Sequence, residues 1–207
     1  MQMVERPRPF PKAGEVLVRI HAVGVCGSDA HYFHEGRIGP YVVNSPLVLG
    51  HEASGRIAAV GDGVDPTRIG QRVSIEPQKP DPTSPESKAG RYNLCPHMEF
   101  FATPPIDGAL TDYVTIGADF AHPIADSVSY EAAALFEPLS VGIASAQKAG
   151  ITAGSRVLIA GAGPVGIVTT QVAKAFGATE VIVSDIDAAR RDVALKFGAT
   201  TVVDPRE

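Results

Sequence analysis

The sequence has 207 residues, 44% of them hydrophobic and 20% charged, and a formal net charge of −5, so it can bury a substantial core as one large domain or two small ones. The mild acidic charge and the lack of a basic block disfavour nucleic acid as a partner. There is no apolar run of about 18 residues and no apolar secretion-signal core at the start, so we expect a cytoplasmic protein without a membrane partner.

The first half of the chain has the pattern of an irregular β-rich domain. Between Glu15 and Ile116 the apolar runs are short and interrupted by Gly and Pro, which is typical of strands joined by turns. The predicted strands lie in EVLVRIHAVGV, SGRIAAVG, QRVSIEP and TDYVTI. Residues 77–93 are polar and rich in proline, which predicts a surface loop or lobe.

Helical and alternating patterns follow. Residues 129–150 have a helical composition interrupted at Pro138, so we expect two helices that meet near this proline and end at Gly150. Beyond Gly150, three apolar runs are separated by two helical segments. Such alternation predicts a parallel sheet with crossover helices, and therefore an α/β fold with a β-rich N-terminal part.

The most specific local motif is GAGPVG at residues 161–166, which follows the apolar run RVLIA and opens a helical segment. In a G-x-G-x-x-G turn the first glycine permits the tight turn, the second lets the backbone approach a pyrophosphate, and the third lets the helix pack close to the strand. The cofactor-binding candidates in this turn are Gly161, Gly163, Pro164, Val165 and Gly166.

Asp185 ends the next apolar run, 19 residues after Gly166, where a carboxylate would accept hydrogen bonds from an adenosine ribose. The same carboxylate would repel a 2′-phosphate, so we expect NAD rather than NADP. Arg190 and Arg191 follow and could soften this preference, although a solvated helix face also accounts for them. Arg190 is kept among the cofactor-binding candidates.

A metal site is a further hypothesis. Cys26 and Cys95 are the only cysteines, which favours free thiols over a disulfide framework. A catalytic zinc takes about three protein donors from cysteine, histidine and carboxylate, and Cys26, His51 and Glu137 can supply them. The alternatives also remain open that Cys26 is a small core residue, His51 a polar group at a turn and Glu137 a charge on a helix surface. Such widely spaced ligands have no regular interval that could be tested.

Four segments spread over most of the chain are GVCGSDAHYFHEGRIG, PLVLGHEASG, GRYNLCPHMEFFATPPIDGALTDYV and EPLSVGIASAQKAG. Together they resemble the zinc-dependent medium-chain dehydrogenases, in the polyol branch of sorbitol (L-iditol 2-) and xylitol dehydrogenases. The resemblance implies a GroES-like catalytic domain at residues 1–138, followed by the first half of a Rossmann NAD-binding domain at residues 139–207. It also implies an active site in the cleft between these domains.

The resemblance assigns roles to individual residues. Cys26, His51 and Glu137 match the zinc-site residues, and Glu52 matches a carboxylate that approaches the metal directly or through water. Ser28 and His31 match a hydroxyl and an imidazole that relay the proton outward. Three further residues match positions that line the polyol pocket, namely Tyr32, Phe100 and Thr103.

The implied reaction is the oxidation of a polyol by NAD⁺ to a ketose, with NADH and a proton as the other products. Zinc would lower the pKa of a bound secondary hydroxyl, whose carbon then gives hydride to the nicotinamide. A serine hydroxyl backed by histidine is a suitable proton route, because imidazole titrates near neutral pH. Alternatives are another zinc-dependent secondary alcohol dehydrogenase, or an inactive zinc-binding or interaction fragment.

The sequence departs from the wider family in two respects. Many relatives carry four clustered cysteines that bind a second, structural zinc, but residues 77–98 contain only Cys95, so we expect one catalytic zinc and no structural one. The chain beyond Gly150 has room for three strands, whereas a complete dinucleotide sheet has six in the order 3-2-1-4-5-6. We therefore expect a truncated form with RVLIA at a sheet edge, and a homo-oligomer in the full-length form.

Overall fold

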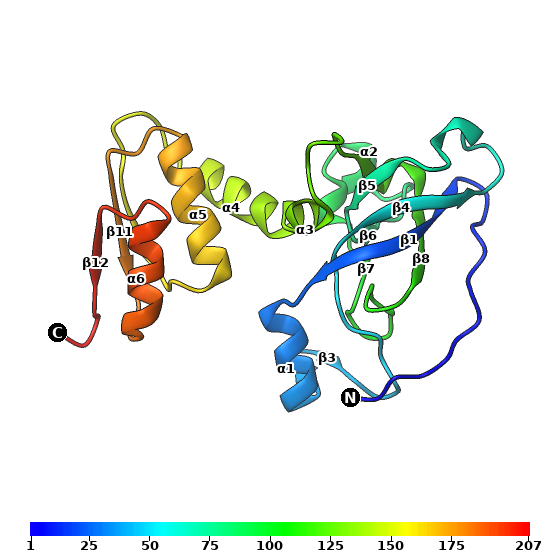
Figure 1. Ribbon diagram of the computed structural model, residues 1–207, viewed down its shortest axis with the longest axis horizontal. Helices are drawn as coiled ribbons and strands as arrows, with labels where there is room; N and C mark the ends of the chain where they lie inside the picture. The colour runs from blue at the N-terminus through cyan, green and yellow to red at the C-terminus, as the bar shows by residue number, and fades with distance from the viewer. The chain divides into compact units, whose positions relative to one another are not determined.

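The computed structural model describes residues 1–207 and contains two compact units, Met1–Glu137 and Pro138–Glu207 (Figure 1). The first unit is built mainly of strands, and the second alternates strands with helices. None of the helices has the length and apolar character needed to cross a bilayer.

A five-stranded antiparallel sheet forms the centre of the first unit, in the order β8-β1-β4-β5-β9. Its strands are β1 (Glu15–Gly24), β4 (Glu52–Val60), β5 (Arg72–Ile75), β8 (Tyr113–Gly117) and β9 (Ala121–Pro123). The four strands predicted from short apolar runs are thus confirmed as β1, β4, β5 and β8. The longest pairing joins β1 to β4 and places Gly24 opposite Glu52, at the end of β1 that leads to Cys26.

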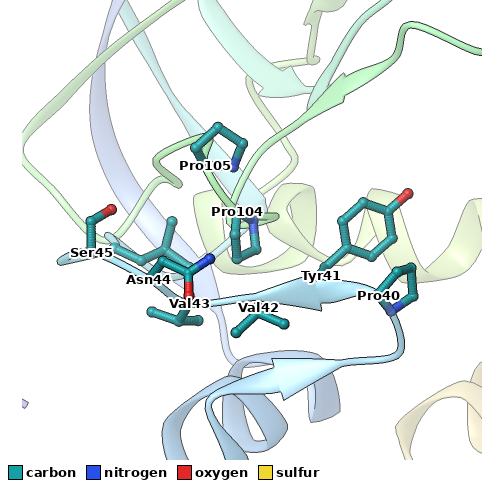
Figure 2. A pocket seen from close by; sticks show the side chains of 9 residues that line it. Pro40, Tyr41, Val42, Val43, Asn44, Ser45, Pro104 and Pro105 are labelled. Atoms are coloured by element: carbon teal, nitrogen blue, oxygen red, sulfur yellow. The ribbon is translucent and has the colours of Figure 1, made fainter.

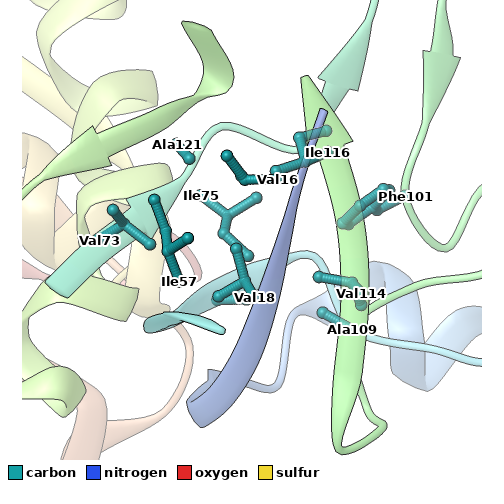
Figure 3. Close-up of a cluster of buried hydrophobic side chains, with 11 residues drawn as sticks. Val16, Val18, Ile57, Val73, Ile75, Phe101, Ala109, Val114, Ile116 and Ala121 are labelled. Carbon is teal, nitrogen blue, oxygen red and sulfur yellow. The ribbon is translucent and has the colours of Figure 1, made fainter. Parts of the chain in front are cut away.

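The hydrophobic core of the first unit lies on one face of this sheet, where side chains from all five strands meet (Figure 3). Ile57 is 1% exposed and Val18 is fully buried. Burying each such side chain contributes about 2 kcal/mol of stability. The other members of the core are Val16, Ala53, Val73, Ile75, Phe101, Ala109, Val114, Ile116 and Ala121.

Short elements complete the first unit. The small sheets pair β2 (Arg37–Ile38) with β3 (Tyr41–Val42), and β6 (Gln78–Lys79) with β7 (Glu99–Phe100). The helices are α1 (Gly27–Glu35), α2 (Pro85–Lys88) and α3 (Tyr130–Ala134), with 3₁₀ turns at Pro66–Arg68, Tyr92–Leu94 and Ala118–Phe120.

The proline-rich lobe, defined as residues 77–98, contains one of the two free cysteines. Cys95 is 6% exposed, and its Sγ accepts a hydrogen bond from the backbone N–H of Asp81 at 3.3 Å. Cys95 therefore joins two parts of the lobe, the segment around residue 95 and the segment around Asp81.

The two helices predicted within residues 129–150 are present and meet near Pro138, with the break just before this proline. The first is α3, and α4 (Phe136–Lys148) begins after a break at Leu135. Pro138 is the third residue of α4. The first four N–H groups of a helix have no intrahelical acceptor, so a proline there removes no bond and does not interrupt the helix.

The second unit contains the predicted parallel sheet, with strand order β10-β11-β12. Its strands are β10 (Arg156–Ala160), β11 (Glu180–Ser184) and β12 (Thr201–Val203), and the crossovers contain α5 (Pro164–Ala175) and α6 (Ala188–Lys196). Val181 and Val183 of β11 are fully buried. Strand β10 lies at the sheet edge as predicted, and its Leu158 is 68% exposed.

Candidate active site

Cys26 lies where β1 has ended and α1 begins, as the N-cap residue of that helix. The helix is held at this point by Asp29, which is 3% exposed. One carboxylate oxygen of Asp29 accepts the backbone N–H of Cys26 at 2.9 Å, and the other accepts the N–H of Gly50 at 2.8 Å. Asp29 therefore fixes the segment of Cys26 against the segment of Gly50, and His51 directly follows Gly50 in the chain.

His51 directly precedes β4 and Glu52 is its first residue, and each is 7% exposed. The Glu52 side chain lies against Gly24 of β1, because a Cβ placed on that glycine would stand 2.1 Å from Glu52 Oε2. Any larger residue at position 24 would displace this carboxylate. The pairing of β1 with β4 thus brings Glu52 next to the segment that contains Cys26.

Three of the four predicted metal ligands converge. The Sγ of Cys26, a ring nitrogen of His51 and a carboxylate oxygen of Glu52 all lie within 4.8 Å of one another. Glu137, in the first turn of α4, is outside this group of three. Its charge nevertheless acts on His51, and that of Glu52 acts on Glu137.

Charges at this group are strongly coupled. The hydrogen bond with His51 lowers the pKa of the Cys26 thiol, against the opposing effect of burial, and Ser28 lowers it further. Burial by itself lowers the pKa of His51, but the bond with Cys26 and the charge of Glu137 outweigh burial and raise it. The interaction between Cys26 and His51 therefore shifts the thiol and the imidazole toward their charged forms.

Both carboxylates are held in an environment unfavourable to their charge. Burial raises the pKa of Glu52, although His51 opposes this. Burial also raises the pKa of Glu137, and the nearby charge of Glu52 raises it further. A divalent cation among these groups would lower the pKa of both carboxylates, because it stabilises their charged forms. It would stabilise the thiolate of Cys26 in the same way.

The donor set fits zinc. Thiolate, imidazole and carboxylate are its usual ligands, and at bond lengths of about 2.1–2.3 Å tetrahedral ligand atoms lie about 3.6 Å apart. A group whose donor atoms lie within 4.8 Å of one another needs only small side-chain adjustments to reach that spacing. Three such donors with a fourth position open are typical of a catalytic rather than a structural site.

The two residues expected to relay a proton lie on α1, close to Cys26 in the sequence. Ser28 is partly buried and hydrogen-bonds to Cys26. His31 is exposed, and its Nδ1 is 3.2 Å from Oε1 of Glu35. The structure therefore places a hydroxyl at the donor group and an imidazole at the solvent, on successive turns of one helix.

The residues expected to line a substrate pocket also lie near the donor group. The ring of Phe100 is centred 5.5 Å from the ring of His51. Tyr32 is buried and hydrogen-bonds to Thr103; burial raises the pKa of its phenol, which that bond opposes. An open pocket of about 310 Å³ is lined by residues 40–45, Leu47, Pro104 and Pro105 (Figure 2). It begins next to Thr103, but none of the three predicted residues lines it.

The glycine turn of the second unit has the expected geometry. Gly161 follows β10 with a φ of 95°, which side chains other than glycine rarely adopt. Gly163 is the N-cap of α5, and Pro164 occupies its first position. A Cβ on Gly166 would stand 2.0 Å from the carbonyl oxygen of Gly161, so only glycine fits there. Val165 is 46% exposed on the first turn.

Asp185 directly follows β11, the strand next to β10, and its side chain contacts the glycine turn. Its carboxylate accepts the backbone N–H of Ala162 at 2.8 Å and that of Asp187 at 2.8 Å. These two bonds lower the pKa of Asp185, and the charges of Arg190 and Arg191 add to the effect. An ionised Asp185 thus stands directly beside the glycine turn, while Arg190 is exposed on α6.

Sequence reasoning did not single out Asp29 or Gly24 as residues that build the site. For Asp29 a local signal existed, because an acid three residues after an N-cap can accept the N-cap N–H. Its second bond, to Gly50, is long-range and has no sequence signature.

We expect Asp29→Asn to loosen the donor group, because an amide can accept only one of the two N–H bonds without placing its own NH₂ against the other. The loss of a buried hydrogen bond of this kind costs about 2 kcal/mol. Zinc titration against a chromogenic chelator should show weaker binding, by tenfold or more at about 1.4 kcal/mol per decade. Asp112→Asn is a control without a side-chain partner. Unchanged zinc affinity in Asp29→Asn would refute the positioning role.

Comparison with known proteins agrees with this geometry. The family model "Alcohol dehydrogenase GroES-like domain" matches residues 12–126, and "Zinc-binding dehydrogenase" matches residues 164–207. A sorbitol dehydrogenase of Bacillus subtilis is 49% identical over 201 residues, covering 97% of this chain and 57% of the relative. The chain thus spans little more than half the length of the curated relatives it matches.

Solved structures agree as well. A short chain alcohol dehydrogenase of Escherichia coli CFT073, complexed with NADH, matches with a TM-score of 0.92 and 32% identity over 100% of this chain and 59% of its own. A zinc-binding dehydrogenase of Sinorhizobium meliloti 1021 bound to NADP matches with a TM-score of 0.86 and 34% identity, over 96% of this chain and 57% of its own.

These matches confirm the predicted fold class, a GroES-like domain followed by part of a Rossmann-type domain. They also confirm the resemblance to the polyol branch, since curated proteins similar to this chain include sorbitol dehydrogenases of Bacillus subtilis and Gallus gallus. The chain belongs to the family of zinc-binding dehydrogenases with an alcohol dehydrogenase GroES-like domain.

Proposed function

We propose that this chain carries the zinc site and the nucleotide turn of an NAD-dependent polyol dehydrogenase, which oxidises a secondary hydroxyl of a sorbitol-like polyol to a ketone. The observation that carries the proposal is the convergence of Cys26, His51 and Glu52 in a chain 49% identical to a sorbitol dehydrogenase. The working protein is proposed to be a cytoplasmic homo-oligomer.

Zinc, when bound, supplies Lewis acidity that lowers the pKa of a coordinated hydroxyl. Cys26, His51 and Glu52 would hold it, with Glu137 as a further ligand or as a neighbouring charge. We propose that this is the only zinc of the chain. Cys95 is engaged by the Asp81 backbone in its own lobe, which supports a packing role.

The other residues of the site orient the substrate and carry the proton. Tyr32, Phe100 and Thr103 would contact the polyol, since Phe100 packs beside His51 and Thr103 hydrogen-bonds to Tyr32. Ser28 would accept the proton released from the substrate hydroxyl, and His31 would pass it to solvent, because its ring is exposed.

The glycine turn would bind the dinucleotide. Backbone N–H groups at the start of α5, together with the helix dipole, favour a pyrophosphate. The Asp185 carboxylate would accept hydrogen bonds from the adenosine ribose and disfavour a 2′-phosphate, so NAD is proposed as the coenzyme. Arg190 would lie near the adenosine end.

The experiment is an assay of the protein that carries this chain, loaded with zinc, for NADH formation from NAD⁺ with sorbitol or xylitol. We expect activity with these polyols that exceeds activity with 2-propanol and that is lost on chelation. Activity only with the simple alcohol would replace the polyol assignment by a general secondary alcohol dehydrogenase. No NADH from any alcohol, in a zinc-loaded folded protein, would overturn the proposal.

A further inference from the structure

Asp204 stands at the end of β12, and its side chain is 7% exposed. Two arginines share its carboxylate. Nη1 of Arg191 donates to Oδ2 at 3.0 Å, Nε of Arg206 donates to Oδ1 at 2.8 Å, and Nη2 of Arg206 donates to Oδ2 at 2.6 Å. This is a charge-assisted network in which one acid holds two guanidinium groups.

The same two arginines also hold the backbone that carries the ribose-facing acid. Nη1 of Arg191 donates to the carbonyl oxygen of Asp185 at 2.6 Å, and Nη2 of Arg206 donates to that of Ile186 at 3.0 Å. The guanidinium group of Arg191 therefore lies beside Asp185, and that of Arg206 lies beside the next residue, Ile186. Asp204 is the acid that fixes them there, because it binds both.

Two guanidinium groups in this position would favour a coenzyme with a 2′-phosphate, and would therefore weaken selection for NAD. Arginine binds phosphate through its planar set of donors, and a 2′-phosphate would stand where the ribose approaches Asp185. Asp185 alone offers one negative charge against these two positive ones and against Arg190, whose charge also acts on Asp185. The family includes proteins of both kinds, since one similar structure holds NADH and another holds NADP.

We propose that Asp204 is a specificity-determining residue of the nucleotide site, which keeps the site selective for an unphosphorylated ribose by occupying Arg191 and Arg206. The inference rests on the proposed nucleotide-binding function of the glycine turn. Asp204 acts through the two arginines and does not itself contact the nucleotide. With Asp204 the charges of the cluster nearly balance, and without it the arginines are free to take a phosphate.

The test compares two probes, 5′-AMP and 2′,5′-ADP, titrated calorimetrically into the 207-residue protein. The wild-type chain should bind 5′-AMP more tightly. In Asp204→Asn the affinity for 2′,5′-ADP relative to 5′-AMP should rise about tenfold, the effect of removing one charge within several ångströms of a dianion. The matched control is Glu180→Gln, which also removes an acid from an arginine pair, with Arg156, but at the opposite end of β11.

A second variant protects the test against a folding defect in Asp204→Asn. Arg206 is 65% exposed, so Arg206→Met should fold normally. It leaves Asp204 with one arginine, and the affinity for 2′,5′-ADP relative to 5′-AMP should fall. An unchanged ratio in both variants overturns the role of Asp204 while leaving nucleotide binding intact. If the wild-type chain binds neither probe, the nucleotide site itself is wrong and the inference fails with it.

Discussion

Cys26→Ala is expected to abolish stoichiometric zinc binding. Cys26 supplies the only sulfur of the donor group, and its thiol pKa is lowered, in the direction of the thiolate that zinc binds. Without it the group keeps His51 and Glu52, with Glu137 nearby, but it has no sulfur donor, and we expect the remaining donors to hold zinc too weakly to retain it through dialysis. Metal analysis after dialysis should show about one zinc per chain in the wild type and close to none in the variant.

The chain provides its own matched control for this result. Cys95→Ala also removes a buried thiol, but one that belongs to the proline-rich lobe and accepts a backbone hydrogen bond. Its zinc content should equal that of the wild type. Zinc retained in Cys26→Ala and lost in Cys95→Ala would place the metal in the lobe and remove the basis of the proposed chemistry.

The second large effect is expected from Gly166→Ala. The new Cβ would stand 2.0 Å from the carbonyl oxygen of Gly161, more than an ångström inside an ordinary contact, so α5 must move away from β10. Overpacking of this kind costs on the order of 3 kcal/mol. The melting temperature should fall by roughly 10 °C, and fluorescence titration should detect no binding of NADH.

Gly163→Ala separates nucleotide binding from folding. A Cβ on Gly163 meets no atom within 4 Å, and the residue has a φ of −73°, so alanine fits the free protein. It would nevertheless stand where the backbone approaches the pyrophosphate. Weaker NADH binding at an unchanged melting temperature is therefore expected. Normal NADH binding in both glycine variants would show that this turn is not the nucleotide site.

Much of the fold could be predicted because its signals are local. The strand and helix alternation after Gly150 follows from apolar runs and from a glycine turn whose steric requirements are confined to residues 161–166. The sequence predicts a junction near Pro138 but not its position just before the proline, and the reason is local as well. A proline in the first turn of a helix and a proline between two helices give the same letters, and only the positions of the hydrogen bonds distinguish them.

The candidate site could be predicted only in part. His51 and Glu52 are adjacent in the sequence, but their meeting with Cys26 depends on the register of β1 against β4, which the residues alone do not specify. The resemblance to a family supplied that information. The Asp29 bond to Gly50 and the Asp204 bonds to two arginines were not predicted, because each joins groups whose proximity is created by tertiary structure.

The Asp29 carboxylate, which joins the N–H of Cys26 to the N–H of Gly50, holds together the segments of the candidate zinc ligands Cys26 and His51 without using a metal. The entropic cost of bringing these side chains together is therefore incurred when the protein folds. An incoming ion then finds the ligands already close to one another. Exchange of one divalent ion for another should then proceed in the folded state, at a rate governed by ligand protonation and access rather than by unfolding.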